Sequence, residues 1–157
     1  MPKRLLRKRL QASAGKPKGW EPVADWYVGY MGKEGGAYQR EVIFPGAERL
    51  LSLKKGGTYR DIACGQGIFP KRMAKDATRT VHGFDISPSL ITEEKKAAPR
   101  NAQFRGADAT HFAAHYPPSS FDGAVCNLAI QNIDQVEPVF PDTARILKSG
   151  GTLILTM

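Results

Sequence analysis

The chain has 157 residues, 41% of them hydrophobic and 24% charged, which is the composition of a globular protein of about one domain. No apolar run approaches the roughly 18 residues of a membrane span, and two cysteines are too few for a disulfide scaffold. These features exclude membrane-spanning and disulfide-stapled classes and favour a reducing, cytoplasmic location.

Positive charge is concentrated at the N-terminus. Seven of the 23 Lys and Arg residues lie within the first 18 residues, which contain no acidic side chain, whereas residues 19–157 hold 16 basic and 15 acidic side chains. The net charge of +8 therefore belongs to an arm, which we expect to be flexible over residues 1–20 and to precede one domain over 21–157. A weak nucleic-acid contact, an organellar targeting signal and a solvated tail are the alternatives for this arm.

Residues 20 to 53 have a helical pattern with interruptions. We expect Gly35-Gly36 to open a helix there and Pro45 to break or kink one. Beyond this segment, strands and helices alternate. The expected strands are 58–64, 80–86, 102–108, 121–129 and 151–157, and the expected helices are 69–77, one that begins at Ser87-Pro88, and 134–147.

The helix expected over 134–147 has both start and stop signals. Asp134 and Glu137 have the spacing of a capping box, and residues 148–151 supply a basic last turn followed by glycines. Pro138 and Pro141 fall inside this span and should kink or split its first half. The alternation of strands and helices predicts an α/β fold, with a doubly wound, mostly parallel sheet of about five strands flanked by helices.

In such a sheet, ligands bind at the carboxyl ends of the strands, beside the first strand. At that place the sequence reads DIACGQG (61–67), where Gly65 and Gly67 permit a sharp turn and close approach to a ligand. A dinucleotide fingerprint would need glycine where this chain has Pro70. Asp61, expected on the same strand face as Ala63 and Gly65, would repel a pyrophosphate but suits a ligand with an ammonium group.

Two further carboxylates end the next two strands. Asp85 lies 20 residues beyond Gly65, where a carboxylate accepts hydrogen bonds from ribose hydroxyls. Asp108, in GADAT, could accept from the exocyclic amine of a purine. Helix capping is the structural alternative for both residues.

Together, DIACGQG, GFDIS, GADAT, FDGAVCNLAIQNI and LKSGGTLILTM resemble, in order and spacing, the class I S-adenosylmethionine-dependent methyltransferases, from about Tyr27 to the C-terminus. The resemblance implies S-adenosylmethionine as cofactor, S-adenosylhomocysteine as product and no metal. It implies that Asp85 holds the ribose, Asp108 the adenine amine, and Asn127 lies near the methyl group. The implied cofactor-binding residues are Tyr38, Asp61, Ala63, Gly65, Gln66, Gly67, Asp85, Ile86, Asp108, Ala109 and Asn127.

The sequence departs from this family in two respects. Class I folds add two strands after the fifth, so the domain is expected to be C-terminally incomplete, to bind the cofactor and to methylate poorly. Strand 151–157 is then expected at a sheet edge, where its apolar side chains favour a dimer. The motif of amino-methylating nucleic-acid enzymes is absent after Asn127, which favours a small-molecule acceptor.

No catalytic base is predicted, because methyl transfer from a sulfonium needs alignment and water exclusion more than acid–base chemistry. The three histidines, His82, His111 and His115, lack partners at metal or triad spacing and are expected to be structural. Two other functions remain as alternatives: a non-catalytic nucleic-acid-binding or assembly module acting through the arm, and an NAD-binding oxidoreductase domain, which Pro70 and Asp61 disfavour.

Overall fold

The computed structural model describes residues 19–157; the basic arm, apart from Gly19 and Trp20, lies outside them. Five strands form one parallel sheet in the order β3-β2-β1-β4-β5. The strands are β1 (Thr58–Ile62), β2 (Thr80–Asp85), β3 (Ala102–Gly106), β4 (Phe121–Asn127) and β5 (Leu147–Thr156). This confirms the predicted doubly wound α/β fold.

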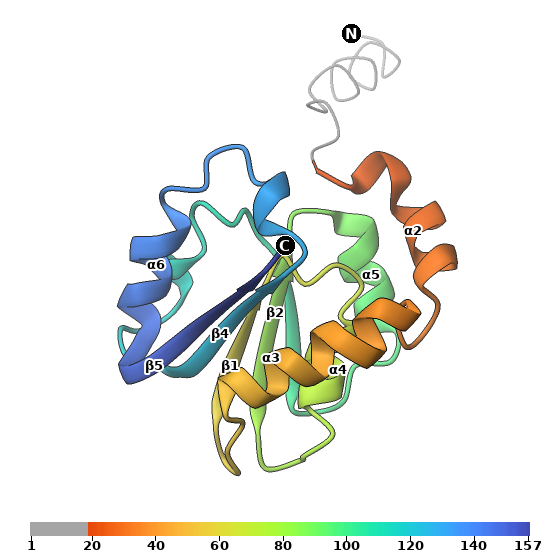
Figure 1. Cartoon of the computed structure of the whole chain (residues 1–157). Coiled ribbons are helices and arrows are strands. Elements are labelled where there is room, and N and C mark those ends of the chain that lie inside the picture. Colours follow the sequence, from red (N-terminus) through yellow and green to blue (C-terminus); the bar gives the residue numbers. More distant parts are fainter. Residues whose placement is uncertain (1–18) are drawn as a thin grey trace, which may run out of the picture.

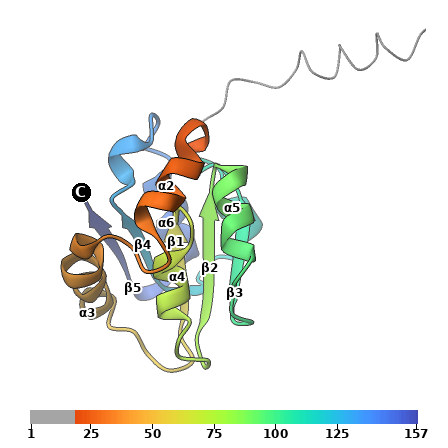
Figure 2. The ribbon, with the colours of Figure 1, turned by 90° about the vertical axis from the view of Figure 1, so that its right-hand side faces the viewer.

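Helices cover both faces of the sheet (Figures 1 and 2). The α-helices are α2 (Ala24–Met31), α3 (Phe44–Leu51), α4 (Ile68–Met73), α5 (Pro88–Lys95) and α6 (Val139–Ile146). The short helical turns are η1 (Glu21–Val23), the π-helical η2 (Gln39–Ile43), η3 (Ala113–His115) and η4 (Ile130–Asn132). Among the described residues, no helix has the length and apolar character needed to cross a membrane.

Side chains alternate between two apolar clusters, one on each face of the sheet. Tyr59 and Val125 pack with residues of α3 and α4, whereas Ile62 and Phe84 pack with residues of η3 and α6. Complete burial of one such side chain stabilises the fold by roughly 1.5–3 kcal/mol. The two clusters fix the sheet between its helices, so the carboxyl ends of the strands are held in a constant arrangement.

The chain passes from β1 outward to β2 and β3 and then returns to the other side of β1 with β4. The connection that follows β1 leads to β2 on one side, and the connection that follows β4 leads to β5 on the other side. These diverging connections leave a crevice between them at the carboxyl ends of β1 and β4. Figure 1 shows α2 beyond these ends, at the upper right. The fold therefore places a ligand-sized space where the sequence puts its glycine loop.

Of the break or kink predicted at Pro45, the break is wrong. Gly35-Gly36 does precede a helix, but this helix runs without interruption through η2 and α3, across Pro45. The wider π-helical turn ends just before Pro45. Such a turn leaves space for the proline ring beside the preceding carbonyls. Proline has no N–H to donate, and here that N–H would fall where the helical hydrogen-bond pattern already changes.

The predicted bounds of the last helix are also wrong. The helix α6 begins at Val139, after Pro138, so Asp134 and Glu137 form no capping box. Pro141 fits within the first turn, where helical N–H groups lack intrahelical partners in any case. At the other end, residues 148–151 belong to β5, because Leu147 already pairs with Phe121 across an irregularity in the ladder.

Several predicted elements are longer than the observed ones. The helix expected over 69–77 ends at Met73, and β1 ends at Ile62 because Ala63 has a φ of 54°. The side-chain alternation that placed Asp61, Ala63 and Gly65 on one strand face therefore stops at Ile62. β5 lies at the edge of the sheet, as predicted.

Candidate functional site

A cavity of about 1320 Å³ lies at the carboxyl ends of β1, β2 and β4, with α2 on its outer side. Of the eleven residues predicted to bind a cofactor, ten line this cavity, and Gly67 does not. The lining members of the set are Tyr38, Asp61, Ala63, Gly65, Gln66, Asp85, Ile86, Asp108, Ala109 and Asn127.

The loop after β1 is shaped by three left-handed residues. Ala63, Gly65 and Gly67 have φ values of 54°, 60° and 74°. A side chain on Gly65 would contact Tyr27 of α2 at 3.6 Å, so the loop and α2 lie close together. Gly67 is needed for a different reason, because a Cβ there would come within 2.8 Å of Glu94 Cγ on α5.

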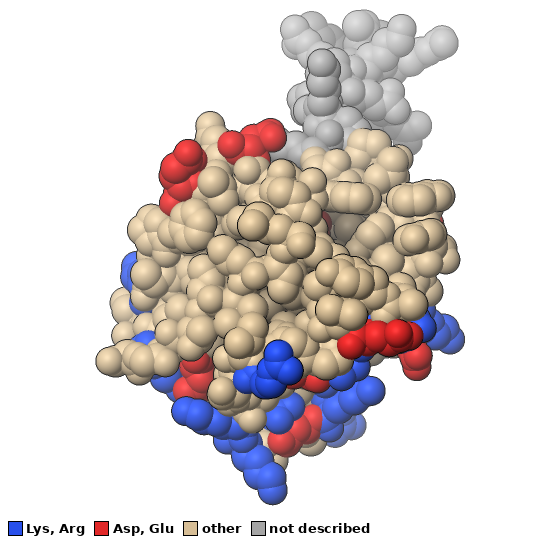
Figure 3. All heavy atoms as spheres, in the orientation of Figure 1, with Lys and Arg blue, Asp and Glu red and all other residues tan. Residues whose placement is uncertain are grey.

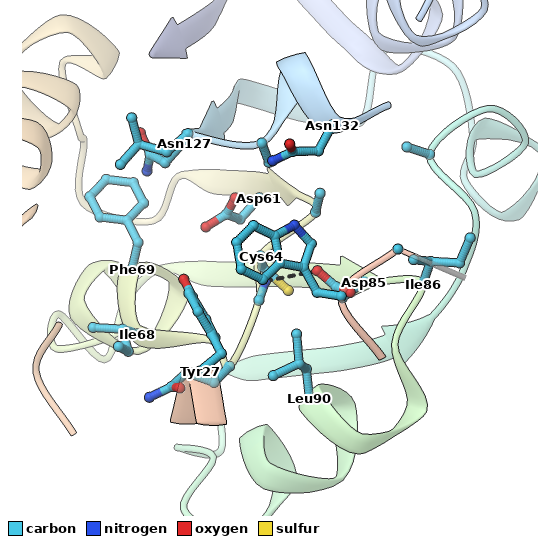
Figure 4. A pocket seen from close by; sticks show the side chains of 18 of the residues that line it. Tyr27, Asp61, Cys64, Ile68, Phe69, Asp85, Ile86, Leu90, Asn127 and Asn132 are labelled. Atoms are coloured by element: carbon cyan, nitrogen blue, oxygen red, sulfur yellow. Dashed lines mark hydrogen bonds between the residues drawn. The ribbon is translucent and has the colours of Figure 1, made fainter. Parts of the chain in front are cut away.

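Asp85 is held by backbone N–H groups from both sides. The Gly65 N–H donates to its Oδ2 (Figure 4) and the Ser87 N–H to its Oδ1, each at 2.9 Å. Burial nevertheless raises the pKa of this carboxyl above its usual value. Each oxygen retains capacity for a second hydrogen bond, so the carboxylate is fixed in place and can accept two donors from a ligand.

Asp61 is 2% exposed, and its Oδ1 has no hydrogen-bond partner in the described structure. Burial raises the pKa of this carboxyl well above its usual value, and the nearby carboxyls of Glu94 and Asp85 raise it further. An ammonium group that reached Asp61 would favour its ionised form and would give the unpartnered Oδ1 a donor, so the position suits ligands that carry positive charge.

Asp108 lies in a turn after β3, where its Oδ1 accepts hydrogen bonds from the Thr110 N–H and Oγ1. It therefore stabilises its own turn rather than capping a helix, while still lining the cavity together with Ile86 and Ala109. At the end of β4, Asn127 Oδ1 accepts a hydrogen bond from Thr156 Oγ1 at 3.3 Å, and its Nδ2 is buried without a partner.

Sequence reasoning missed most of the aromatic side of the cavity. Trp20, which directly precedes η1, lines it together with Trp26, Tyr27 and Tyr30 of α2, whereas only Tyr38 had been assigned to the site. The four-residue spacing of Trp26 and Tyr30 was a usable signal, since such residues share one helix face. Nothing in the sequence showed that this face turns toward the glycine loop.

Sequence reasoning also missed an acidic side chain behind the glycine loop. Glu94 on α5 is fully buried, and its Oε1 accepts a hydrogen bond from Cys64 Sγ at 2.9 Å. Burial raises the pKa of Glu94 to about 8. Three carboxyls, those of Asp61, Asp85 and Glu94, thus lie around Cys64, and burial raises the pKa of each above its usual value.

The histidines occupy positions away from this group. His82 packs edge-on against Tyr116 and Phe121, and burial lowers its pKa to about 4. His111 Nδ1 contacts Thr110 Oγ1. Across residues 19–157, no cluster of His, Cys, Asp and Glu could hold a metal ion, and both cysteines are free thiols.

The chain matches the family model described as "Methyltransferase domain" over residues 60–155. It is 23% identical over 108 residues to demethylmenaquinone methyltransferase of Bacillus licheniformis. This match covers 68% of this chain and 47% of the relative. It is 29% identical over 125 residues to aklanonic acid methyltransferase DauC of a Streptomyces species, covering 74% of this chain and 56% of that one.

Among solved structures, the chain resembles Haemonchus contortus phosphoethanolamine N-methyltransferase 2, in complex with phosphomonomethylethanolamine and S-adenosylhomocysteine. The TM-score is 0.72 at 25% identity, and the match covers 87% of this chain and 33% of that one. The chain spans about half the length of the demethylmenaquinone methyltransferases that it matches, 47% in Bacillus licheniformis and 44% in Tropheryma whipplei.

Proposed function

This chain belongs to the methyltransferase domain family, and we propose that its protein transfers a methyl group from S-adenosylmethionine to a small-molecule acceptor, with S-adenosylhomocysteine as product. The observation that carries the proposal is the set of carboxylates at the strand ends. Asp61, Asp85 and Asp108 line one cavity, beside a glycine loop, at the switch point of a parallel sheet.

The cavity fits this cofactor better than a dinucleotide. Asp61, buried with an open acceptor site, suits a ligand with an ammonium and a sulfonium, whereas it would repel a pyrophosphate. Asp85 would hold the ribose hydroxyls and Asp108 the adenine amine, with Ile86 and Ala109 against the base. The glycine loop would run alongside the methionine portion of the cofactor, and Tyr38 would cover the carboxylate of that portion.

When bound, the cofactor would supply an activated methyl group: an acceptor lone pair would bond to the methyl carbon, the electrons of the broken C–S bond would stay on sulfur, and the acceptor's proton would be lost to solvent as the product leaves. The chain's residues then have to align the acceptor and exclude water, and no side chain is assigned as a base. Asn127 would lie nearest the transferred group, and the aromatic residues of α2 would cover it.

Partners and location are proposed on narrower grounds. The exposed edge strand β5, with Leu155 38% exposed, supports a dimer formed through this edge. The two free thiols support a cytoplasmic location. The seven basic residues in 1–18 support a weak nucleic-acid contact through the arm.

Calorimetric titration with S-adenosylhomocysteine and, separately, with NAD tests the cofactor. We expect S-adenosylhomocysteine to bind and NAD to bind at least tenfold more weakly, because only NAD brings a pyrophosphate near Asp61. Preferential binding of NAD would overturn the proposal and favour an oxidoreductase. Binding of neither ligand would favour a non-catalytic module.

A further inference from the structure

Exposed aromatic side chains of this protein gather at the mouth of the cavity. Trp26 and Tyr30 on α2 are 62% and 71% exposed, and Trp20 and Tyr38 are also exposed cavity-lining residues. Of the strongly exposed aromatics in residues 19–157, only Phe140 on α6 lies outside the cavity lining. Leaving large aromatic rings in water is unfavourable, so their concentration at one opening indicates a surface built for a ligand.

Two of these rings form a stacked pair. Trp26 and Tyr30 stack with their centroids 5.3 Å apart and their planes 12° from parallel. They are four residues apart, so they project from the same face of α2. Rings in this arrangement face each other with an offset, and each keeps one outer face, on which a planar ligand can extend the stack.

The described part of the cavity lining offers no counter-charge to an anionic acceptor. The described lining contains no Lys, Arg or His, but it contains four carboxyls, those of Asp61, Asp85, Asp108 and Asp134. In Figure 3 the basic side chains gather at the lower end of the molecule, and the surface around the hollow in the upper half carries none. A phosphate group on the acceptor would enter this space without a cationic partner among the described lining residues.

The opposite wall offers neutral polar groups. Asn127 and Asn132 lie across the cavity from Tyr27 and Leu90 (Figure 4). The Nδ2 of Asn127 is buried and has no hydrogen-bond partner in the described structure, so a ligand oxygen that reached it would satisfy an unpaired donor. The volume of about 1320 Å³ exceeds the roughly 300–1,000 Å³ of a site for one small ligand, which leaves room for an acceptor beside a cofactor.

We infer that the methyl acceptor is an uncharged, planar aromatic compound with a hydroxyl or carbonyl oxygen. Its rings stack on the outer face of the Trp26–Tyr30 pair, and its oxygen accepts a hydrogen bond from Asn127. This inference rests on the proposed function, because it takes the inner half of the cavity as the cofactor site. On the same grounds of charge, the acceptor carries no phosphate group.

Calorimetry on the full chain, saturated with S-adenosylhomocysteine, tests the inference with two probes of the same ring system, 1-naphthol and 1-naphthyl phosphate. We expect 1-naphthol to bind and 1-naphthyl phosphate to bind at least tenfold more weakly. Trp26→Ala and Tyr30→Ala should each weaken 1-naphthol binding about three- to tenfold, the range for a lost aromatic contact. Trp26→Phe should restore most of the affinity, and Phe140→Ala, the matched exposed control, should leave it unchanged.

The outcomes separate this inference from the proposed function. If S-adenosylhomocysteine does not bind, the proposed function fails before either probe is added. If it binds but 1-naphthol does not, or if 1-naphthyl phosphate binds equally well, the inference about the acceptor is overturned while the cofactor site stands. An equal effect of Trp26→Ala and Phe140→Ala would show non-specific adsorption and would also overturn it. Both helices expose these side chains, so the substitutions should not prevent folding.

Discussion

Glu94→Gln should stabilise this protein at neutral and alkaline pH. The Glu94 side chain is fully buried on α5; its Oε1 accepts a hydrogen bond from Cys64 Sγ, and its Oε2 has no partner in the described structure. Burial raises its pKa from 4.5 to about 8, with a further contribution from the charge of Asp85. The native state therefore keeps Glu94 protonated at a pH where the unfolded chain has released the proton.

The direction of the effect follows from proton linkage. Between pH 4.5 and about 8 the native state binds more protons at Glu94 than the unfolded state does, so the free energy of unfolding falls as the pH rises. With 1.36 kcal/mol for each pKa unit, the part of this loss between pH 5 and pH 8 is about 3 kcal/mol. Gln keeps the shape and the acceptor oxygen but carries no proton to lose, so the variant should escape this loss.

Urea unfolding at pH 5, 6, 7 and 8, with the difference between variant and wild type taken at each pH, measures the effect. We expect the difference to grow by about 3 kcal/mol toward pH 8, which corresponds to roughly 6–12 °C in melting temperature for a chain of this size. Glu93→Gln is the matched control on the same helix. It removes only the ion pair with Lys96 on the surface and should show a small difference that does not change with pH.

A difference between Glu94→Gln and wild type that stays constant from pH 5 to pH 8 would refute the reasoning. It would mean that Glu94 is ionised in the native state, with solvent or a cation reaching its buried oxygens. A growing difference in the Glu93→Gln control would equally show that the pH dependence does not arise from burial.

Three other changes test separate parts of the structure. Asp85→Ala should lower S-adenosylhomocysteine affinity at least tenfold by calorimetry, because it removes charge-assisted hydrogen bonds of about 1.5–3 kcal/mol each, while unchanged affinity would contradict the ribose assignment. Glu21→Ala should speed amide hydrogen exchange in α2 and at the Ser89 N–H, because Glu21 accepts hydrogen bonds from Ser87, the N-cap of α5, and from Ser89 in its first turn; unchanged exchange in α2 would show that these bonds do not hold α2. Deletion of residues 1–18 should preserve cofactor affinity and abolish any salt-sensitive RNA binding. In the full chain, the RNA affinity should fall with salt concentration, with a log–log slope of about −0.7 per phosphate contacted. RNA binding that survives the deletion would exclude the arm as the RNA-binding site.

The order of the strands and helices and the polar end of the cavity could be predicted from local patterns in the sequence. Alternating strands and helices predicted a parallel sheet, and such a sheet brings the carboxyl ends of its strands to one edge. Asp85 and Asp108 follow different strands but share that edge, so their meeting in one cavity is a consequence of topology. The Ser87 cap of α5, which accepts from the Leu90 N–H at 3.2 Å, was likewise a local signal.

Errors arose where one local signal competed with another. Asp134 and Glu137 have the spacing of a capping box, but the helix begins only at Val139, directly after Pro138. Pro45 was expected to break a helix, but η2 and α3 continue across it because packing of Phe44 and Ala47 in the core outweighs the local penalty. The glycines at 150 and 151 resembled a helix stop, although pairing with β4 made them part of β5.

By itself, the sequence determined the fold class, the strand that carries the glycine loop and the carboxylates at the strand ends, because each depends on neighbours within a few residues. Only the tertiary structure decided that α2 turns its aromatic face toward the cavity, that Glu94 is buried behind Cys64 and that no basic side chain reaches the described lining. These features depend on residues far apart in the chain, such as Glu21 with Ser89 and Cys64 with Glu94. Burial and charge at such contacts are set by packing in three dimensions, and periodicity along the chain carries no record of them.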